Sequence, residues 1–251
     1  MNESLSIIVP AYNEADCIES SLGEILRFAR SYGQSVDVVV VDDGSTDKTA
    51  DLVEASRSRL LPQDPPVTLI RQGTNRGKGA AVHTGFKHAR GEIVLFTDAD
   101  LSAPMSEALH LIRPIEEGAC DVAIGSRAVD PSMIGTPQSR LRRGSGRLFN
   151  RMVRWITRLD LGDTQCGFKA FRRTAIAPIF ALQRVERFAF DVELLYLAAK
   201  FGLRVVELPV RWNHVHDSRV SLIRDGSRML RDLCRIRLND WRGAYQVNGR
   251  D

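Results

Sequence analysis

Short apolar, β-branched runs alternate with helix-like segments through the first half of this chain of 251 residues. The apolar runs predict five strands, at residues 5–9, 36–41, 67–70, 93–96 and 121–124. Helical patterns lie between them, at about 15–32, 45–59, 80–89 and 106–117. Strands that are apolar throughout are buried on both faces. The pattern therefore predicts an α/β fold, with a mainly parallel sheet flanked by helices.

The pattern changes after Gly125. Residues 127–147 are loop-like and basic, and a helix with an apolar stripe follows them. We then expect a helix over 191–201, a strand over 203–210 and a basic helix from 222 to about 240. The sequence shows no clear linker, so we expect one large domain over 1–215, with halves at about 1–126 and 127–215. A basic amphipathic helix and tail would occupy 216–251.

Composition excludes several classes of protein. Hydrophobic residues make up 43% of the chain, enough for a large core. No apolar run approaches the roughly 20 residues that span a bilayer. The N-terminal segment MNESLSIIVPAYNE lacks the basic start and long apolar stretch of a secretory signal. The four cysteines are far apart and form no CxxC pair, so we expect a reduced, cytoplasmic protein without a metal–thiolate site.

Polar segments follow four of the predicted strands. They are Pro10–Glu14, Asp42–Asp47, Asp98–Asp100 and Gly125–Arg127. Each alone is compatible with ordinary turn chemistry. In an open α/β sheet, however, ligands bind outside the carboxyl ends of the strands. Four such segments at one edge therefore predict a common site.

The Asp-Ala-Asp segment at 98–100 suits a hard divalent cation. Mg²⁺ or Mn²⁺ is usually bound by one or two carboxylates of the protein together with phosphate oxygens of the substrate. The motif is weak alone, but it follows a buried strand and precedes Pro104. We expect Asp98 and Asp100 to hold a metal ion that bridges a diphosphate.

A glycine-rich segment, Gly73–Gly79, resembles a P-loop but does not match one. Gln72 and Gly79 depart from the required G-x-x-x-x-G-K-[ST] pattern, and the G-x-G-x-x-G spacing is absent too. What remains is a glycine-rich turn at a helix start, with Arg76 and Lys78 available to a phosphate.

Taken in order, these motifs resemble the family 2 glycosyltransferases, which have a GT-A fold. The motifs are VPAYNE at 9–14, VDDGSTD at 41–47, NRGKG at 75–79 and DAD at 98–100. Two later segments, DTQCGFK at 163–169 and ERFAFDVELL at 186–195, are similar to the dolichyl-phosphate β-glucosyltransferase subgroup. Dolichyl-phosphate mannosyltransferases share the first half but match the later segments less well. The resemblance covers roughly residues 4–215.

The resemblance implies an inverting transfer of a sugar from a nucleotide sugar to a polyprenyl or dolichyl phosphate. The resemblance favours glucose as the transferred sugar and UDP-glucose as its donor. It implies Mg²⁺ or Mn²⁺ as the cofactor. Residues 1–126 would bind the donor and 127–215 the acceptor. The residues implied in nucleotide-sugar binding are Pro10, Tyr12, Glu14, Asp42, Asp43, Arg76, Lys78, Asp98 and Lys169. Those implied in catalysis are Asp100, Gln165, Asp191 and Arg127. Ser102 stands where mannosyltransferase relatives often place a glutamine ligand, so a third protein ligand is not expected.

A lipid phosphate is already anionic, so the resemblance requires positioning of the acceptor more than a base. Arginine suits such contacts, and the candidates are Arg127, Arg140, Arg142 and Arg143. The last three also fit a solvated basic loop. Asp191 leaves two readings open: a general base for a sugar hydroxyl, or a carboxylate that orients Arg or Lys around a phosphate. The resemblance favours the second.

A lipid acceptor requires contact with a membrane. In two segments, 147–158 and 222–241, arginines are interleaved with apolar residues. Such helices can lie in a membrane interface, but they also fit ordinary helices packed on a core with a basic outer face. We expect peripheral binding at the cytosolic face of a membrane and no nucleic-acid partner. The alternatives are a GDP-mannose-dependent enzyme, a transferase acting on a saccharide hydroxyl, and a nucleotide-sugar binding module without catalysis.

Overall fold

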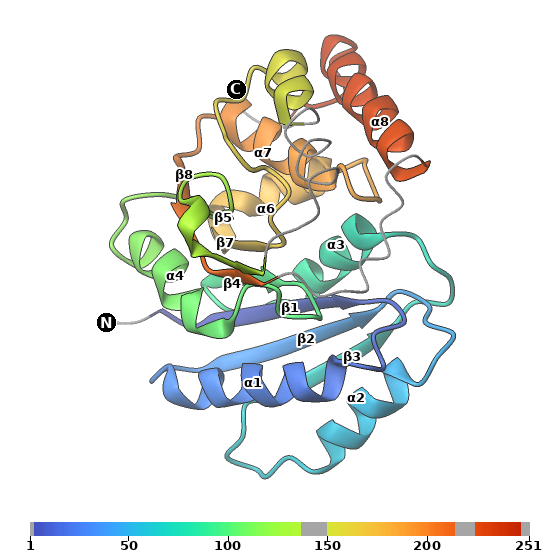
Figure 1. The fold of residues 1–251 in the computed structure, drawn as a ribbon, viewed down its shortest axis with the longest axis vertical. Coiled ribbons are helices and arrows are strands. Elements are labelled where there is room, and N and C mark those ends of the chain that lie inside the picture. The colour runs from blue at the N-terminus through green and yellow to red at the C-terminus, as the bar shows by residue number, and fades with distance from the viewer. Residues whose placement is uncertain (1–2, 137–149, 214–223, 247–251) are drawn as a thin grey trace.

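A seven-stranded sheet with the order β3-β2-β1-β4-β7-β5-β8 forms the centre of the computed structural model, which describes residues 3–136, 150–213 and 224–246 (Figure 1). The strands are β1 (Leu5–Ala11), β2 (Val36–Asp42), β3 (Val67–Arg71), β4 (Ile93–Thr97), β5 (Val122–Ser126), β7 (Phe168–Arg172) and β8 (Val205–Pro209). A separate pair joins β6 (Ile134–Thr136) to β9 (Trp212–Asn213). The predicted α/β class and the five early strands are confirmed.

Helices cover both faces of the sheet and make a three-layer architecture (Figure 1). On one face lie α1 (Ile18–Ser31), α2 (Thr49–Ser58) and α4 (Ala108–Glu116), the last entered through a short 3₁₀ turn, Met105–Glu107. On the other lie α3 (Lys78–His88), α6 (Arg173–Leu182), α7 (Phe190–Lys200), α8 (Arg224–Trp241) and a helix over 150–157. A second 3₁₀ turn, Pro131–Met133, leads into β6. Within the described residues, no helix has the length and apolarity needed to cross a bilayer.

The two cores follow from alternation along each strand. In β1, Ile7 and Val9 pack beneath α1 and α4, whereas Ile8 packs beneath α3 and the helices beyond it. Successive side chains on a strand point to opposite faces, so an entirely apolar strand contributes to both layers. This is why the apolar runs predicted the parallel part of the sheet.

The strand β7 and the helix α6 were not predicted. β7 lies between β4 and β5 and runs antiparallel to both, with Lys169 opposite Phe96 on one side and Ile124 on the other. It differs from the other central strands because a lysine sits at its second position. The sheet is therefore mainly parallel, as predicted, but one of its inner strands, β7, comes from the second half of the chain. The boundaries proposed at 126 and 215 stay predictions.

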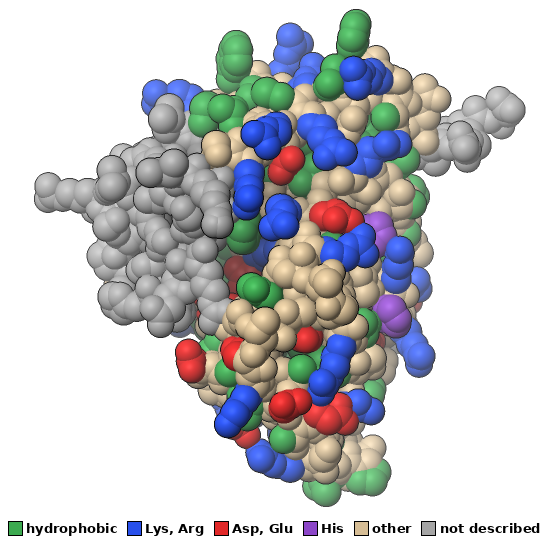
Figure 2. Space-filling view, turned by 90° about the vertical axis from the view of Figure 1, so that its right-hand side faces the viewer, with side chains coloured by type: hydrophobic (Ala, Val, Ile, Leu, Met, Phe, Trp, Pro, Cys, Tyr) green, Lys and Arg blue, Asp and Glu red, His purple; other side chains and the backbone are tan. Residues whose placement is uncertain are grey.

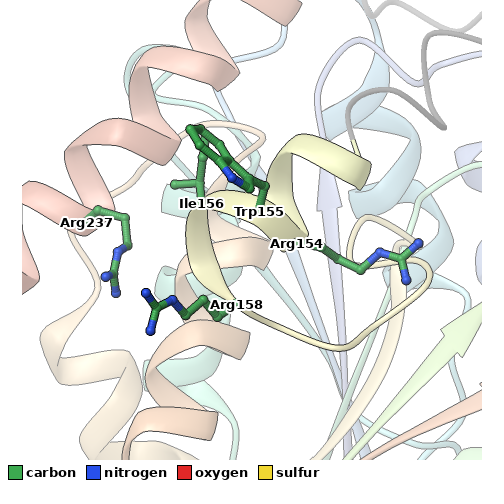
Figure 3. Close-up of a pocket in the computed structure, with 5 residues that line it drawn as sticks. All are labelled: Arg154, Trp155, Ile156, Arg158 and Arg237. Carbon is green, nitrogen blue, oxygen red and sulfur yellow. The ribbon is translucent and has the colours of Figure 1, made fainter.

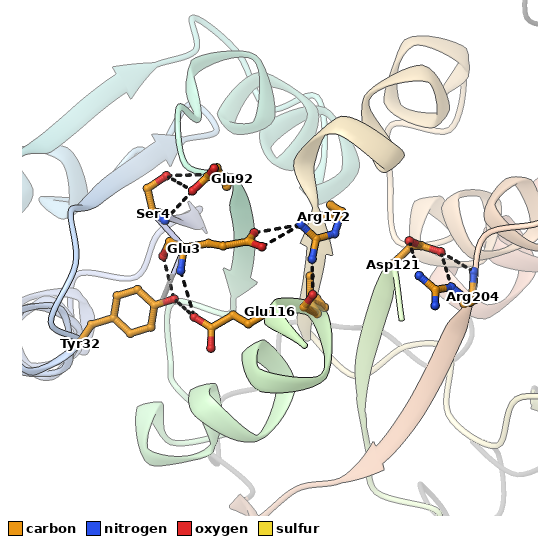
Figure 4. Close-up of polar contacts among 9 residues, drawn as sticks. Glu3, Ser4, Tyr32, Glu92, Glu116, Asp121, Arg172 and Arg204 are labelled. Atoms are coloured by element: carbon orange, nitrogen blue, oxygen red, sulfur yellow. Dashed lines mark hydrogen bonds and ion pairs between the residues drawn. The ribbon is translucent and has the colours of Figure 1, made fainter. Parts of the chain in front are cut away.

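Polar contacts fasten the edge of the sheet that lies away from the carboxyl ends of β1 and β4 (Figure 4). Arg172, at the end of β7, donates to both carboxylate oxygens of Glu3 at 3.0 Å and also to the backbone oxygen of Ile115. Tyr32 donates to Glu116 at 2.8 Å, and its burial raises the pKa of its hydroxyl. These contacts join the start of β1 to β7 and α4.

Replacing Phe171 of β7 by alanine is expected to lower the free energy of unfolding by about 3–5 kcal/mol, because this buried ring packs on Phe96 and Phe180. Urea denaturation at neutral pH measures the change. The control is Leu61→Ala, since Leu61 is 58% exposed and its replacement should change stability by less than about 0.5 kcal/mol. Equal, small effects of both substitutions would contradict the central position of β7.

Candidate active site

The carboxyl ends of β1, β2, β4 and β5 meet the start of β7 at one edge of the sheet. Ala11 pairs with Asp42, and Thr97 pairs with Phe168. The four polar segments that follow the parallel strands therefore gather at this edge, as the sequence predicted. The antiparallel β7 brings Gln165–Lys169 to the same place from the opposite direction.

Two lysines balance the carboxylates at this edge. Lys78, the first residue of α3, lies 2.5 Å from Asp98 (Nζ to Oδ1). Burial lowers the pKa of Lys78, but the charges of Asp98 and Asp191 outweigh burial and leave it raised. Lys169 lies 2.8 Å from Asp191 (Nζ to Oδ1) and also donates to the backbone oxygen of Cys166 at 2.5 Å. These contacts bring together four residues that the sequence had implicated separately.

The Lys169–Asp191 pair is almost completely buried, with side-chain exposures of 1% and 4%. Burial raises the pKa of Asp191, and the charges of Lys169 and Lys78 oppose that rise. Both lysine ammonium groups also lie over the ring of Phe96, at 5.3 Å for Lys169 and 5.7 Å for Lys78. A buried charge is tolerated only with such partners, so each member of the pair depends on the other.

Asp100 lies beside Asp98 and is half-buried. Its Oδ1 accepts a hydrogen bond from the Ser102 backbone at 3.0 Å. Burial, and then the charge of Asp98, raise the pKa of Asp100. A divalent cation shared by the two carboxylates would relieve this repulsion, and their oxygens are the donors that Mg²⁺ and Mn²⁺ prefer. Among the described residues, no group of three or more His, Cys, Asp or Glu side chains could hold a metal ion. Asp98 and Asp100 could supply two oxygen ligands to such a cation, and water or substrate oxygens could supply the others.

Gly167 explains how the Asp98 carboxylate fits against the start of β7. A Cβ atom at this position would collide with all three terminal atoms of the Asp98 side chain. Glycine is needed here because of this close approach and not because of an unusual backbone conformation.

On the predicted nucleotide side, Asp43 holds the glycine-rich loop. Its carboxylate accepts hydrogen bonds from the backbone of Arg76 at 2.9 Å and of Gly77 at 2.7 Å. Burial raises its pKa. Gly77 has φ +115°, a conformation that side-chain-bearing residues rarely adopt, and it begins α3 just before Lys78. Asp43 therefore also helps to place Lys78.

The other predicted nucleotide residues lie around the ends of β1 and β2. Pro10 and Asp42 are buried, Glu14 is half-buried and Tyr12 is 37% exposed. Asn13, which the sequence analysis did not single out, joins the two strand ends. Its side chain accepts from the Thr46 backbone at 2.7 Å, and its backbone donates to Ser45 at 2.8 Å.

The predicted phosphate-binding arginines are placed differently from one another. Arg127 makes a two-pronged ion pair with Asp163, at 2.6 and 2.8 Å, and its guanidinium lies over Trp212 at 5.3 Å. The charge of Arg127 overcomes burial and lowers the pKa of Asp163. Arg76 is exposed and pairs with Glu186. The predicted residues Arg140, Arg142 and Arg143 lie outside the described residues.

Two further contacts were missed from sequence. Arg187 packs its side chain against Gly77, and its charge helps to lower the pKa of Asp43 against the effect of burial. Gln165 donates from its backbone to Asp163 at 3.2 Å, and its Nε2 lies 4.0 Å from Sδ of Met229. The helix α8 therefore reaches the site. Arg187 lies in the recognised 186–195 segment, but one arginine among many carried no signal of its own.

The comparisons with known proteins agree with this geometry. Residues 6–180 match the model of glycosyl transferase family 2. The chain is 36% identical over 260 residues to dolichyl-phosphate beta-glucosyltransferase of Saccharomyces cerevisiae, covering 97% of this chain and 77% of that protein. It is 32% identical to the enzyme of the same name from Homo sapiens, covering 98% and 78%.

Solved structures share the fold at low sequence identity. Glucosyl-3-phosphoglycerate synthase from Mycobacterium tuberculosis, in complex with Mn²⁺, UDP and glucosyl-3-phosphoglycerate, gives a TM-score of 0.67 at 18% identity, covering 96% of this chain and 80% of that one. The mannosyltransferase PcManGT from Pyrobaculum calidifontis, in complex with GDP-Man and Mn²⁺, gives 0.60 at 23%, covering 92% and 61%. The fold is of the GT-A type. The chain belongs to glycosyl transferase family 2 and is a glycosyltransferase.

Replacing Gly167 by alanine is expected to slow sugar transfer by about a hundredfold and to weaken Mn²⁺ binding, because the new methyl group displaces the Asp98 carboxylate. Initial rates and titration calorimetry measure the two effects. Gly23→Ala is the matched control, because a Cβ at Gly23 meets only the flexible end of Arg27 at 3.7 Å. Unchanged rate and metal affinity in Gly167→Ala would show that the position of Asp98 is not critical.

The contribution of the Arg127–Asp163 pair to the stability of the fold is expected to depend on pH. Because the folded-state pKa of Asp163 is lowered, its contribution is present above the unfolded-state pKa of about 3.9 and is lost as the pH falls through the folded-state pKa. Asp163→Asn should lower the free energy of unfolding at neutral pH by about 3–5 kcal/mol, since it leaves the charge of Arg127 without its counter-ion.

At acidic pH, the free energy of unfolding of Asp163→Asn should also change less steeply with pH than that of the wild type. The difference in slope corresponds to up to one proton, about 1.4 kcal/mol per pH unit. Urea denaturation from neutral pH to below pH ~4 tests this. Asp160→Asn, at an exposed position, is the control. An acid limb as steep as that of the wild type would rule out Asp163 as a contributor.

Proposed function

We propose that this chain transfers glucose from UDP-glucose to a polyprenyl phosphate, with inversion at the anomeric carbon. The similarity over nearly the whole chain to dolichyl-phosphate beta-glucosyltransferases supports this reaction. The observation that carries it within the structure is the buried Lys169–Asp191 ion pair, because it bears directly on the kind of acceptor.

Asp191 is poorly suited to act as a base. Its carboxylate is sealed from solvent and bound to Lys169 at 2.8 Å, so removing a proton from an acceptor would break this ion pair. A sugar hydroxyl needs a base, whereas a phosphate oxygen is anionic at neutral pH and does not. The geometry therefore favours the phosphate acceptor over the saccharide acceptor. In this reading, Asp191 holds Lys169 in place at the start of β7.

On the donor side, Asp98 and Asp100 are proposed to hold Mg²⁺ or Mn²⁺ together with the diphosphate. When bound, the metal would act as a Lewis acid that stabilises charge on the leaving diphosphate. The chain itself contributes Lys78, which already lies against Asp98 at 2.5 Å and begins α3. The positive end of that helix also favours an anion. Lys78 is thus placed to exchange its carboxylate partner for a phosphate oxygen.

The acceptor phosphate is proposed to approach from the side of Gln165 and Arg127. Arg127 is held in one orientation by Asp163 and Trp212, so it presents a fixed charge and not a mobile one. Because a polyprenyl phosphate resides in a membrane, the enzyme would work at a membrane surface, for which we propose the cytosolic face.

Transfer assays test the reaction. The purified chain with polyprenyl phosphate and Mg²⁺ or Mn²⁺ is expected to transfer sugar to lipid from UDP-glucose and not from GDP-mannose. Asp100→Ala should slow this transfer about a hundredfold or more, because several kcal/mol of charge stabilisation is lost. Asp191→Asn should retain more activity than Asp100→Ala, because it keeps an acceptor for Lys169. Asp160→Asn serves as the exposed control.

Other outcomes would support one of the alternative functions. Transfer from GDP-mannose alone would show that the donor is GDP-mannose and not UDP-glucose. Equal losses in Asp191→Asn and Asp100→Ala, with transfer to a sugar hydroxyl, would make Asp191 the base. Nucleotide-sugar binding without turnover on any acceptor would indicate a binding module.

A further inference from the structure

Two tryptophans project from the end of the molecule formed by the helix over 150–157 and α8. Trp155 is 83% exposed and Trp241 is 85% exposed, the largest exposures among the large hydrophobic side chains of the described residues. Tryptophan is usually well buried in globular proteins, but it is enriched where proteins meet the membrane–water interface. Trp241 lies one helical turn beyond Arg237, on the same side of α8.

A hollow of about 570 Å³ lies beside Trp155, between the two helices, and is lined by Arg154, Trp155, Ile156, Arg158 and Arg237. Figure 3 shows the guanidinium groups of Arg158 and Arg237 pointing toward one another across it, with Arg154 directed away. An anion bound between two like charges that face each other lowers their repulsion.

The described residues supply little negative charge to this hollow. Asp240 is 3.8 Å from Arg237, but its carboxylate also accepts from Tyr196 and pairs with Lys200. No acidic side chain in the described part of the chain pairs with Arg154 or Arg158. Among the described residues, the hollow is thus lined by three arginines, with one shared carboxylate, that of Asp240, beside Arg237.

Arg158 also occupies a backbone conformation that suits glycine better. Its φ is +60°, in the left-handed region, which costs a side-chain-bearing residue about 1–2 kcal/mol. A cation at a helix C-terminus recovers part of this cost.

We propose that this hollow seats the headgroup phosphate of an anionic phospholipid, while Trp155 and Trp241 lie in the membrane interface. The inference rests on the proposed function only in assuming that the acceptor is membrane-borne. Figure 2 shows Lys and Arg side chains gathered on the upper part of the molecule, where these helices lie, together with projecting hydrophobic side chains. A basic surface with exposed tryptophans matches an anionic membrane in charge and in polarity.

Docking through this surface also connects the membrane to the active site. Met229 of α8 contacts Gln165, so the helix that would lie on the lipid also borders the predicted acceptor side. We take this phosphate-binding hollow to be distinct from the acceptor site, since its described lining includes neither Gln165 nor Arg127. Its role would be to hold the enzyme in one orientation on the bilayer.

Sedimentation of the full chain with phosphatidylcholine vesicles, with and without phosphatidylserine, tests whether this hollow is a seat for a lipid phosphate. Neither vesicle contains polyprenyl phosphate, and no nucleotide sugar is added. We expect binding only to the anionic vesicles. Arg158→Gly should weaken it about fivefold, in line with roughly 1 kcal/mol per basic residue near the surface. The double variant Trp155→Ala, Trp241→Ala should weaken it further.

Matched controls remove the same kinds of side chain elsewhere. Arg113→Ala removes an exposed arginine from α4, and Leu61→Ala removes an exposed apolar side chain. Both should bind like the wild type. Arg158→Gly should fold at least as stably as the wild type, because glycine suits the left-handed conformation, so weaker binding could not be attributed to unfolding.

Three results would overturn the seat: wild-type binding by the Arg158 and tryptophan variants, equal binding to neutral vesicles, or complete displacement by inorganic phosphate, which would indicate a site for free anions. A short, water-soluble isoprenyl phosphate separates this test from that of the proposed function. The variants should transfer sugar to it at the wild-type rate. Loss of transfer in the wild type with vesicle binding intact would reject the function and leave the seat in place.

Discussion

The buried ion pair between Lys169 and Asp191 is the interaction on which the site depends. Lys169 is carried into the middle of the sheet by β7, and Asp191 comes from the first turn of α7, so the pair fixes a strand against a helix. Gly167 immediately precedes this strand, and its missing side chain leaves space for Asp98. If the pair were broken, an uncompensated charge would remain buried between the sheet and α7.

Further charged groups of alternating sign lie between the buried pair and the glycine-rich loop. From the buried pair, negative and positive groups alternate through Asp98, Lys78 and the loop that Asp43 holds. Such a site is balanced only in part, since Asp98 and Asp100 still repel each other. In the proposed reaction, a metal ion and a diphosphate would together add charges of both signs. The site would then accept the two as a unit at less cost than either alone.

The sequence predicted what depends on local pattern and missed what depends on distant partners. Predominantly apolar runs specified β1, β2 and β4, and the polar residues after them specified the edge where they meet. β7 escaped prediction because Lys169 interrupts its apolar pattern, and only Asp191, from a later helix, makes that lysine acceptable. The pairing of Arg127 was also not predictable from local pattern, because its partner Asp163 lies in a different loop. Motif resemblance identified these residues, but it did not reveal which of them bind each other.

The insertion of β7 also constrains how the chain can be made. During synthesis, β4 and β5 emerge before the strand that fills the space between them, because β7 begins only at Phe168. Until then, both strands have an unpaired edge, and such edges favour aggregation. A fragment ending at residue 126 would keep this gap permanently. Folding must await the second half of the polypeptide, so non-local pairing, and with it slow assembly, is built into the topology.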